Sequence, residues 1–270
     1  MKRYFLLLTL CLLSLWRVVK ELLILLTLSQ ESQQWLSFVL AIIILLIVYV
    51  IPISMLVIWF FGEKGQTWKE YCCALVFGAL IIGQPAGWLN TKLSDMSLAA
   101  FSRVSGLEEW LPSMIPPLVE ESLKMLLAIL LLYLLRIKTI RQALSVGAGV
   151  GLGFQLSEDY TYILGALVEN QVSPIQEALG RLSSSFASHW LLTTLMIGAW
   201  FLLVKIGVTQ FTVKCYLILP FLLHVIWNTS VVDGSLLLKG LLTIISLGLL
   251  FYFYQTIERI EKHQSLAMLD

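Results

Sequence analysis

Acidic, basic and imidazole side chains interrupt several long apolar runs of this 270-residue sequence. Such groups cost roughly a few kcal/mol each when they are inserted into a bilayer, so each is a candidate functional residue. Carboxylates and imidazoles are also the groups that transfer protons or bind divalent metal ions. The candidates, in chain order, are Glu120, Glu121, Lys124, Glu158, Asp159, His189, His224 and Asn228.

Eight apolar segments must position these residues, and each approaches the roughly 20 residues that a membrane-spanning helix needs. The composition agrees, because 59% of the residues are hydrophobic, only 13% are charged and the mean hydropathy is +0.88. A net charge of +1 offers no basic field for nucleic acid. We therefore predict an all-α, polytopic transmembrane helix bundle whose surroundings are the lipid bilayer. The predicted spans are 4–28, 36–61, 70–89, 112–135, 142–168, 183–204, 215–232 and 240–257.

The distribution of Lys and Arg predicts the orientation of the bundle. With the amino terminus inside, the inner segments carry 11 of the 18 basic residues, the outer segments carry 4, and the other 3 lie within spans. Both termini are therefore expected to be cytoplasmic. The first apolar run follows Lys2 and Arg3, as in a signal peptide, but no small-x-small cleavage site follows it, so we expect a retained helix.

Three local features refine this picture. Pro52 and Pro85 are expected to kink the second and third spans. The connection 90–111, which contains Arg103, is either an interfacial helix over the site or a solvated loop. Small-xxx-small spacing at 147/151 and 149/153 predicts two faces on which helices approach closely, rather than a nucleotide-binding loop.

The depth of the candidate residues predicts one shared site. With a rise of about 1.5 Å per residue, Glu120 and His224 lie about 12 Å from the outer ends of their spans. On the same basis Glu158 lies about 15 Å deep and His189 about 9 Å deep. Four residues on four helices thus reach one level in the outer half of the membrane, where they could surround a single cavity.

Helical spacing assigns faces to some of these residues. Glu120 and Lys124 share a face at i and i+4, as do Phe154 and Glu158, and His224 and Asn228. Glu121 points about 100° away from Glu120. One of these two glutamates is expected to face the cavity and the other to point elsewhere, and the sequence leaves open which.

Two carboxylates and two imidazoles in one buried cavity could bind a divalent metal ion, with Zn²⁺ the expected one. We expect His189, His224 and Glu158 as metal ligands and Glu120 or Glu121 as the general base. Glu158 could alternatively protonate the leaving amine, and Asn228 could donate a hydrogen bond to the oxyanion. The supporting residues are Lys124, Phe154 and Asp159. The H-E-x-x-H zinc signature is absent.

Four motifs, in this order, resemble those of the PrsW family of intramembrane proteases, relatives of the CPBP (Abi) group that includes the CAAX prenyl endopeptidases. They are E-E-x-x-K at 120–124, G-F-x-x-x-E at 153–158, the lone intramembrane His189 and H-x-x-x-N at 224–228. The resemblance covers about 112–232, and Lys124 and Glu158 favour the PrsW side. Asp159 departs from the pattern, because PrsW-like members usually have Asn there.

The resemblance implies cleavage of a single-pass, membrane-anchored regulatory protein, such as an anti-sigma factor. The expected location is the extracytoplasmic side of a bacterial cytoplasmic membrane. It also divides the chain into accessory helices (1–111), a catalytic core (112–232) and a last helix with a tail (233–270). A CAAX prenyl protease-like enzyme, a non-catalytic immunity-type protein and a proton-coupled transporter stay open as alternatives, since buried Glu and His chains also relay protons.

Overall fold

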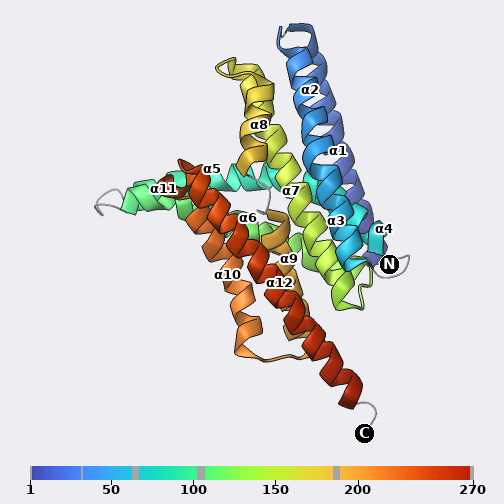
Figure 1. Ribbon diagram of the computed structural model, residues 1–270. Coiled ribbons are helices and arrows are strands. Elements are labelled where there is room, and N and C mark those ends of the chain that lie inside the picture. Colours follow the sequence, from blue (N-terminus) through green and yellow to red (C-terminus); the bar gives the residue numbers. More distant parts are fainter. Residues whose placement is uncertain (1, 32, 63–66, 102–106, 185–188, 268–270) are drawn as a thin grey trace.

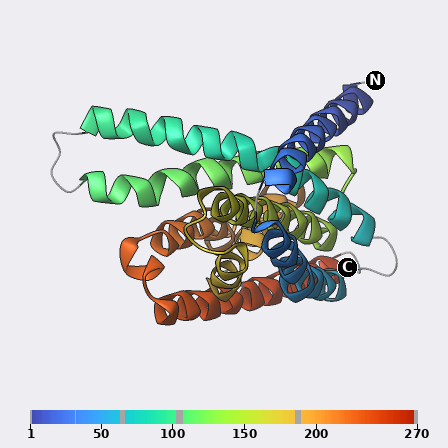
Figure 2. The ribbon, with the colours of Figure 1, turned by 90° about the horizontal axis from the view of Figure 1, so that it is seen from above.

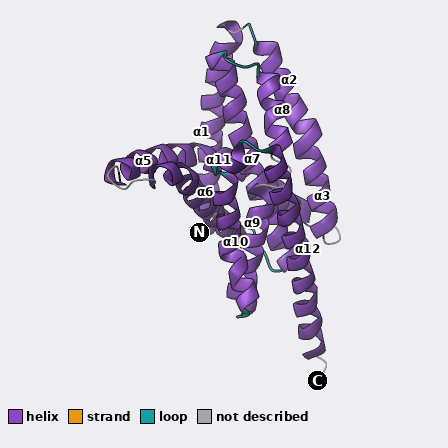
Figure 3. Cartoon of the chain, turned by 60° about the vertical axis from the view of Figure 1, so that its left-hand side comes forward, coloured by secondary structure: helices purple, strands orange, loops and turns teal. Residues whose placement is uncertain are grey.

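The described chain is almost entirely helical, apart from short loops, and contains no β-strand (Figure 3), which confirms the predicted all-α fold. The computed structural model describes residues 2–31, 33–62, 67–101, 107–184 and 189–267. The elements are α1 (Lys2–Glu31), α2 (Trp35–Leu45), η1 (Leu46–Val50), α3 (Ile51–Phe61), α4 (Thr67–Phe77), η2 (Gly78–Ile82), α5 (Gly83–Phe101), α6 (Leu107–Leu134), α7 (Ile140–Glu169), α8 (Pro174–Ser184), α9 (His189–Phe201), η3 (Leu202–Ile206), α10 (Phe211–Trp227), α11 (Ser230–Asp233) and α12 (Leu236–Ala267).

Four helical stretches of the described chain are long and apolar enough to cross a membrane. They are Trp35–Phe61, Trp68–Phe101, His189–Ile206 and Leu236–Lys262. Helix α10 is apolar but shorter, whereas α1, α6 and α7 have 28 to 30 residues but carry charged or polar side chains. The two helices that hold most of the candidate site residues, α6 and α7, are thus not among these four stretches.

Each of the two prolines that were expected to kink their helices lies shortly after a π-helical turn. Pro52 follows η1, and Pro85 follows η2 by three residues. A proline has no N–H to donate to the carbonyl four residues earlier, so the preceding turn must rearrange its hydrogen bonds. The helical path stays continuous through these turns, from α2 to α3 and from α4 to α5.

The connection 90–111 is largely helical. Helix α5 continues to Phe101 as part of the third predicted span, and α6 begins at Leu107, before the predicted start at 112. Figure 2 shows α5 and the first part of α6 side by side, projecting from the bundle, and Figure 1 shows α5 crossing the direction of α1 and α2. Arg103 lies outside the described residues.

Helix α8 was not predicted, and it lies mostly between the predicted spans 142–168 and 183–204. Its start has a recognisable signal, with Pro174 at the first helical position. Ser173 Oγ accepts a hydrogen bond from the Gln176 N–H (3.2 Å), and Gln176 Oε1 accepts one from the Ser173 N–H (3.2 Å). This reciprocal pair is a capping box, which begins a helix within the connection.

Helix α7 lies at the centre of the fold and packs against α4, α6, α8 and α9. Its glycines face two neighbours, as the spacing predicted. A Cβ on Gly147 would lie 3.0 Å from Thr193 O of α9, and one on Gly149 would lie 2.7 Å from Tyr71 O of α4. The close contacts of α7 with α9 and with α4 therefore require glycine, which has no side chain, at these positions, and this confirms the packing interpretation.

This packing makes Gly149→Ala a specific test. The added methyl would also lie 2.9 Å from Ala74 Cβ, so we expect unfolding in mixed micelles to show a loss of about 1–3 kcal/mol. Gly165→Ala on the same helix is the control, since its Cβ meets nothing within 4 Å and the change should stabilise the helix by up to about 1 kcal/mol. Equal stabilities of the two variants would contradict the close approach of α4 and α7.

Candidate active site

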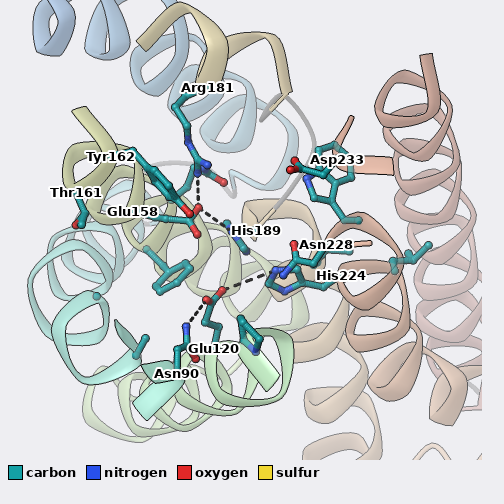
Figure 4. Close-up of a pocket in the computed structure, with 18 of the residues that line it drawn as sticks. Asn90, Glu120, Glu158, Thr161, Tyr162, Arg181, His189, His224, Asn228 and Asp233 are labelled. Carbon is teal, nitrogen blue, oxygen red and sulfur yellow. Dashed lines mark hydrogen bonds and ion pairs between the residues drawn. The ribbon is translucent and has the colours of Figure 1, made fainter. Parts of the chain in front are cut away.

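Side chains of four helices meet at a cavity of about 460 Å³ inside the bundle (Figure 4). Glu120 and Glu121 come from α6, Glu158 from α7, His189 from the first residue of α9, and His224 from α10. The predicted convergence of these four helices is thus what the structure shows. The polar residues that line the cavity are Asn90, Glu120, Gln155, Glu158, Thr161, Tyr162, Arg181, His189, His224, Asn228, Asp233, Lys239 and Ser246.

Glu121 lies behind the two imidazole rings. Its Oε1 atom is 2.8 Å from His224 Nδ1 and 3.8 Å from His189 Nδ1, and it accepts a hydrogen bond from Lys124 Nζ (2.6 Å). Lys124 Nζ also lies 2.7 Å from His189 Nδ1. All four residues are buried. A carboxylate on the outer nitrogen of a histidine fixes the ring and its tautomer, which suits the opposite nitrogen for metal binding.

Glu120 faces the cavity. Its Oε1 atom accepts a hydrogen bond from Asn90 Nδ2 of α5 (2.9 Å), and its Oε2 atom lies 3.8 Å from His224 Nε2. That Oε2 atom is buried and has no hydrogen-bond partner among the described residues. Glu120 thus lines the cavity, as expected of one of the two adjacent glutamates, whereas Glu121 does not line it and lies behind the histidine rings. Lys124 pairs with Glu121 at i+3 rather than with Glu120.

The donor set fits a divalent cation. One ligand atom each from Glu120, His189 and His224 lie within 4.8 Å of one another, and all three residues are buried. The unpartnered Glu120 oxygen is a group that such a cation would satisfy. If the acidic groups are ionised and the histidines neutral, the cluster has a net charge of −2, from four acids (Glu120, Glu121, Glu158 and Asp159) and two bases (Lys124 and Arg181).

Glu158 lies at the edge of this set rather than within it. Its Oε2 atom is 3.4 Å from His189 Nε2, and the same oxygen forms an ion pair with Arg181 Nη2. The sequence-based ligand set contained Glu158, whereas the three residues that the structure brings within ligand distance contain Glu120 instead. The difference coincides with the ion pair that Arg181 forms with the Glu158 carboxylate.

The supporting residues have clear contacts. The Phe154 ring meets the His189 ring edge-on at 4.9 Å, and Lys124 Nζ lies 4.6 Å from the Phe154 ring centre. Asp159 is fully buried and accepts hydrogen bonds from Arg181 Nε (2.6 Å) and Gln155 Nε2 (2.9 Å). Asn228 ends α10 and lines the cavity with His224.

Among the cavity residues that sequence reasoning missed, Asn90 and Arg181 contact predicted site glutamates. Arg181 had a usable signal, because it is the single Lys or Arg between 142 and 204 and two adjacent intramembrane acids in that range need a counter-ion. Asn90 had none, since a neutral amide near a helix end is common. Both residues come from segments outside the predicted spans.

A helical membrane protein whose buried carboxylates and imidazoles can hold a divalent cation has the features of a membrane-embedded metalloenzyme. The model of a family described as PrsW family intramembrane metalloprotease matches residues 66–256. The match covers more than half of the chain, so the chain belongs to the PrsW family. It also extends beyond 112–232 to include α5 with Asn90 and much of α12. Comparisons with curated proteins and with solved structures found no match.

Proposed function

We propose that this chain is a metal-dependent intramembrane endopeptidase that hydrolyses a peptide bond of a membrane-anchored regulatory protein, with the Glu120–His189–His224 cluster as its centre. The observation that carries the proposal is that these three buried residues each offer a ligand atom within 4.8 Å of the other two. In addition, the Oε2 atom of the Glu120 carboxylate has no hydrogen-bond partner among the described residues. The expected ion is Zn²⁺, because it accepts histidine nitrogen and carboxylate oxygen together.

When bound, such a cation supplies Lewis acidity toward the scissile carbonyl group and the attacking water. The protein side chains do the rest. Glu121 holds the His224 ring by Nδ1 and thereby directs Nε2 toward Glu120. Lys124 balances the charge of Glu121 in a region without solvent, so Glu121 can stay ionised behind the rings.

Glu158 is placed to move the proton. It lines the cavity beside His189, so it can accept a proton from the attacking water and return it to the leaving amine. The Asn228 side chain lines the same cavity and can donate an amide hydrogen to the oxyanion. These roles separate the three glutamates: Glu120 is the ligand, Glu121 orients the histidines and Glu158 carries the proton.

The membrane arrangement follows from the same helices. We propose eight spans with both termini in the cytoplasm and the site in the outer half of the bilayer, near the extracytoplasmic side. The support is that the described residues of each predicted apolar segment are mostly helical, and that the basic residues favour the proposed inner side. A substrate such as an anti-sigma factor would then be cleaved near its extracytoplasmic end.

Removing the metal tests the reaction. In liposomes that contain the purified protein and a fluorescently labelled single-span substrate, we expect chelation with 1,10-phenanthroline to abolish cleavage and added Zn²⁺ to restore it. Elemental analysis should find about one transition-metal ion per chain, as three protein ligands imply. Full cleavage after exhaustive chelation would contradict the metal-dependent proposal. Proton flux without cleavage, followed with a trapped pH-sensitive dye, would favour a carrier instead.

A further inference from the structure

Arg181 links α8 to the candidate site through two acidic residues of α7 (Figure 4). We infer that Arg181 is a positioning residue that holds Glu158 beside His189 and keeps it out of the metal ligand set. The inference rests on the proposed function and deepens it. It assigns a role to a helix that no motif of the sequence includes.

The Arg181 guanidinium is held on three sides. Its Nε donates to Asp159 Oδ1 (2.6 Å), its Nη2 pairs with Glu158 Oε2, and its central carbon lies 4.3 Å from the Tyr162 ring centre. Asp159 is itself held by Gln155 Nε2 (2.9 Å) and is fully buried. A planar guanidinium with several fixed partners has one orientation, so the Glu158 carboxylate has one as well.

The position of Glu158 explains why such a restraint is needed. Its Oε2 atom is 3.4 Å from His189 Nε2, close enough for Glu158 to reach a cation held by that histidine. Catalytic zinc sites keep one position for water or substrate, and a fourth protein ligand beside that water would raise the coordination number above four and crowd the position. Arg181 supplies the competing positive charge, so Glu158 stays near the reacting atoms as an ionised side chain without becoming a ligand.

The arrangement also gives Asp159 a function. A buried carboxylate without a counter-ion is unfavourable, and Arg181 compensates Asp159 as well as Glu158. Asp159 fixes the Nε edge of the guanidinium, while the Nη2 edge is left for Glu158. Replacing Asp159 by Asn removes one charge but keeps an amide oxygen for Nε, so in the Asp159→Asn background a change of Arg181 leaves no buried charge at position 159.

The test uses the full-length protein loaded with Co²⁺, whose visible absorption weakens when its coordination number rises above four. Asp159→Asn supplies the reference spectrum. Adding Arg181→Gln should release Glu158 to the metal and reduce the visible absorption, and kcat for a labelled single-span substrate should fall by about 10–100-fold with little change in KM. Arg181→Lys should recover part of both losses.

A third variant separates a positioning role from a structural one. Adding Glu158→Gln to the Asp159→Asn/Arg181→Gln protein removes the competing anionic ligand, so the absorption should return to the reference. An unchanged spectrum in Asp159→Asn/Arg181→Gln, or a reduced spectrum that Glu158→Gln does not restore, would overturn the inference and leave the proposed function standing. Wild-type protein that takes up no Co²⁺ would contradict both.

Discussion

Glu120→Gln is expected to lower the rate of peptide cleavage by more than about a hundredfold, the upper range for changes in the second shell of a metal site. The substitution is nearly isosteric, and its carbonyl oxygen can still accept the hydrogen bond that Asn90 Nδ2 donates to Glu120 Oε1 (2.9 Å). What it removes is the negative charge and the unpartnered Oε2 atom. The fold should therefore persist while metal binding weakens.

Two measurements on the same preparation check this result. Cleavage of a labelled single-span substrate in liposomes gives the activity, and elemental analysis gives the metal content, which we expect to fall together. Glu169→Gln at the exposed end of α7 is the matched control and should change neither. A Glu120→Gln protein with wild-type metal content and near-wild-type cleavage would contradict the assignment of Glu120 as a ligand.

The helices and the convergence of the site residues could be predicted because a membrane protein shows both as clear patterns in its sequence. A spanning helix needs a long apolar run, and a charge within such a run is costly, so Glu120, Glu158 and His224 stand out against their neighbours. A fixed rise per residue then turns sequence position into depth. The agreement in depth among antiparallel helices is what predicted one site.

The roles within the site could not be predicted, because each imidazole has two nitrogens. Helical geometry predicts that Glu120 and Glu121 point about 100° apart, so that one of them faces the cavity, and it does not say which one. In the structure the His224 ring lies between them, with Nε2 toward Glu120 and Nδ1 toward Glu121. The orientation of the His224 ring depends on how α10 packs against α6. The spacing of residues along α6 cannot predict it.

The contributions of α5 and α8 were missed for different reasons. Asn90 is neutral, so it carries no insertion cost that would mark it. Arg181 lies in the amphipathic helix α8, between two predicted spans. The capping box of Ser173 and Gln176 at the start of α8 was available in the sequence and was not used. The charge balance of α7 was the available clue, since Glu158 and Asp159 have no basic residue within their own helix near them.

Glu121→Gln should be the most destabilising substitution at the site. Lys124 is fully buried, and its ammonium group is 2.6 Å from the Glu121 carboxylate that balances its charge. Breaking a buried pair by removing one partner typically costs about 3–5 kcal/mol. We expect this loss in the free energy of unfolding measured in mixed micelles, together with a loss of peptide cleavage.

The double variant Glu121→Gln/Lys124→Met separates stability from orientation. Replacing both charges removes the unpaired ammonium, so most of the stability should return, as it does when buried pairs are exchanged for neutral groups. Activity should stay about 10–100-fold below wild type, because His224 Nδ1 has lost the carboxylate that fixed its ring. If the double variant recovered full cleavage, Glu121 would be only the counter-ion of Lys124, and the orientation of the two histidines would have to come from elsewhere in the bundle.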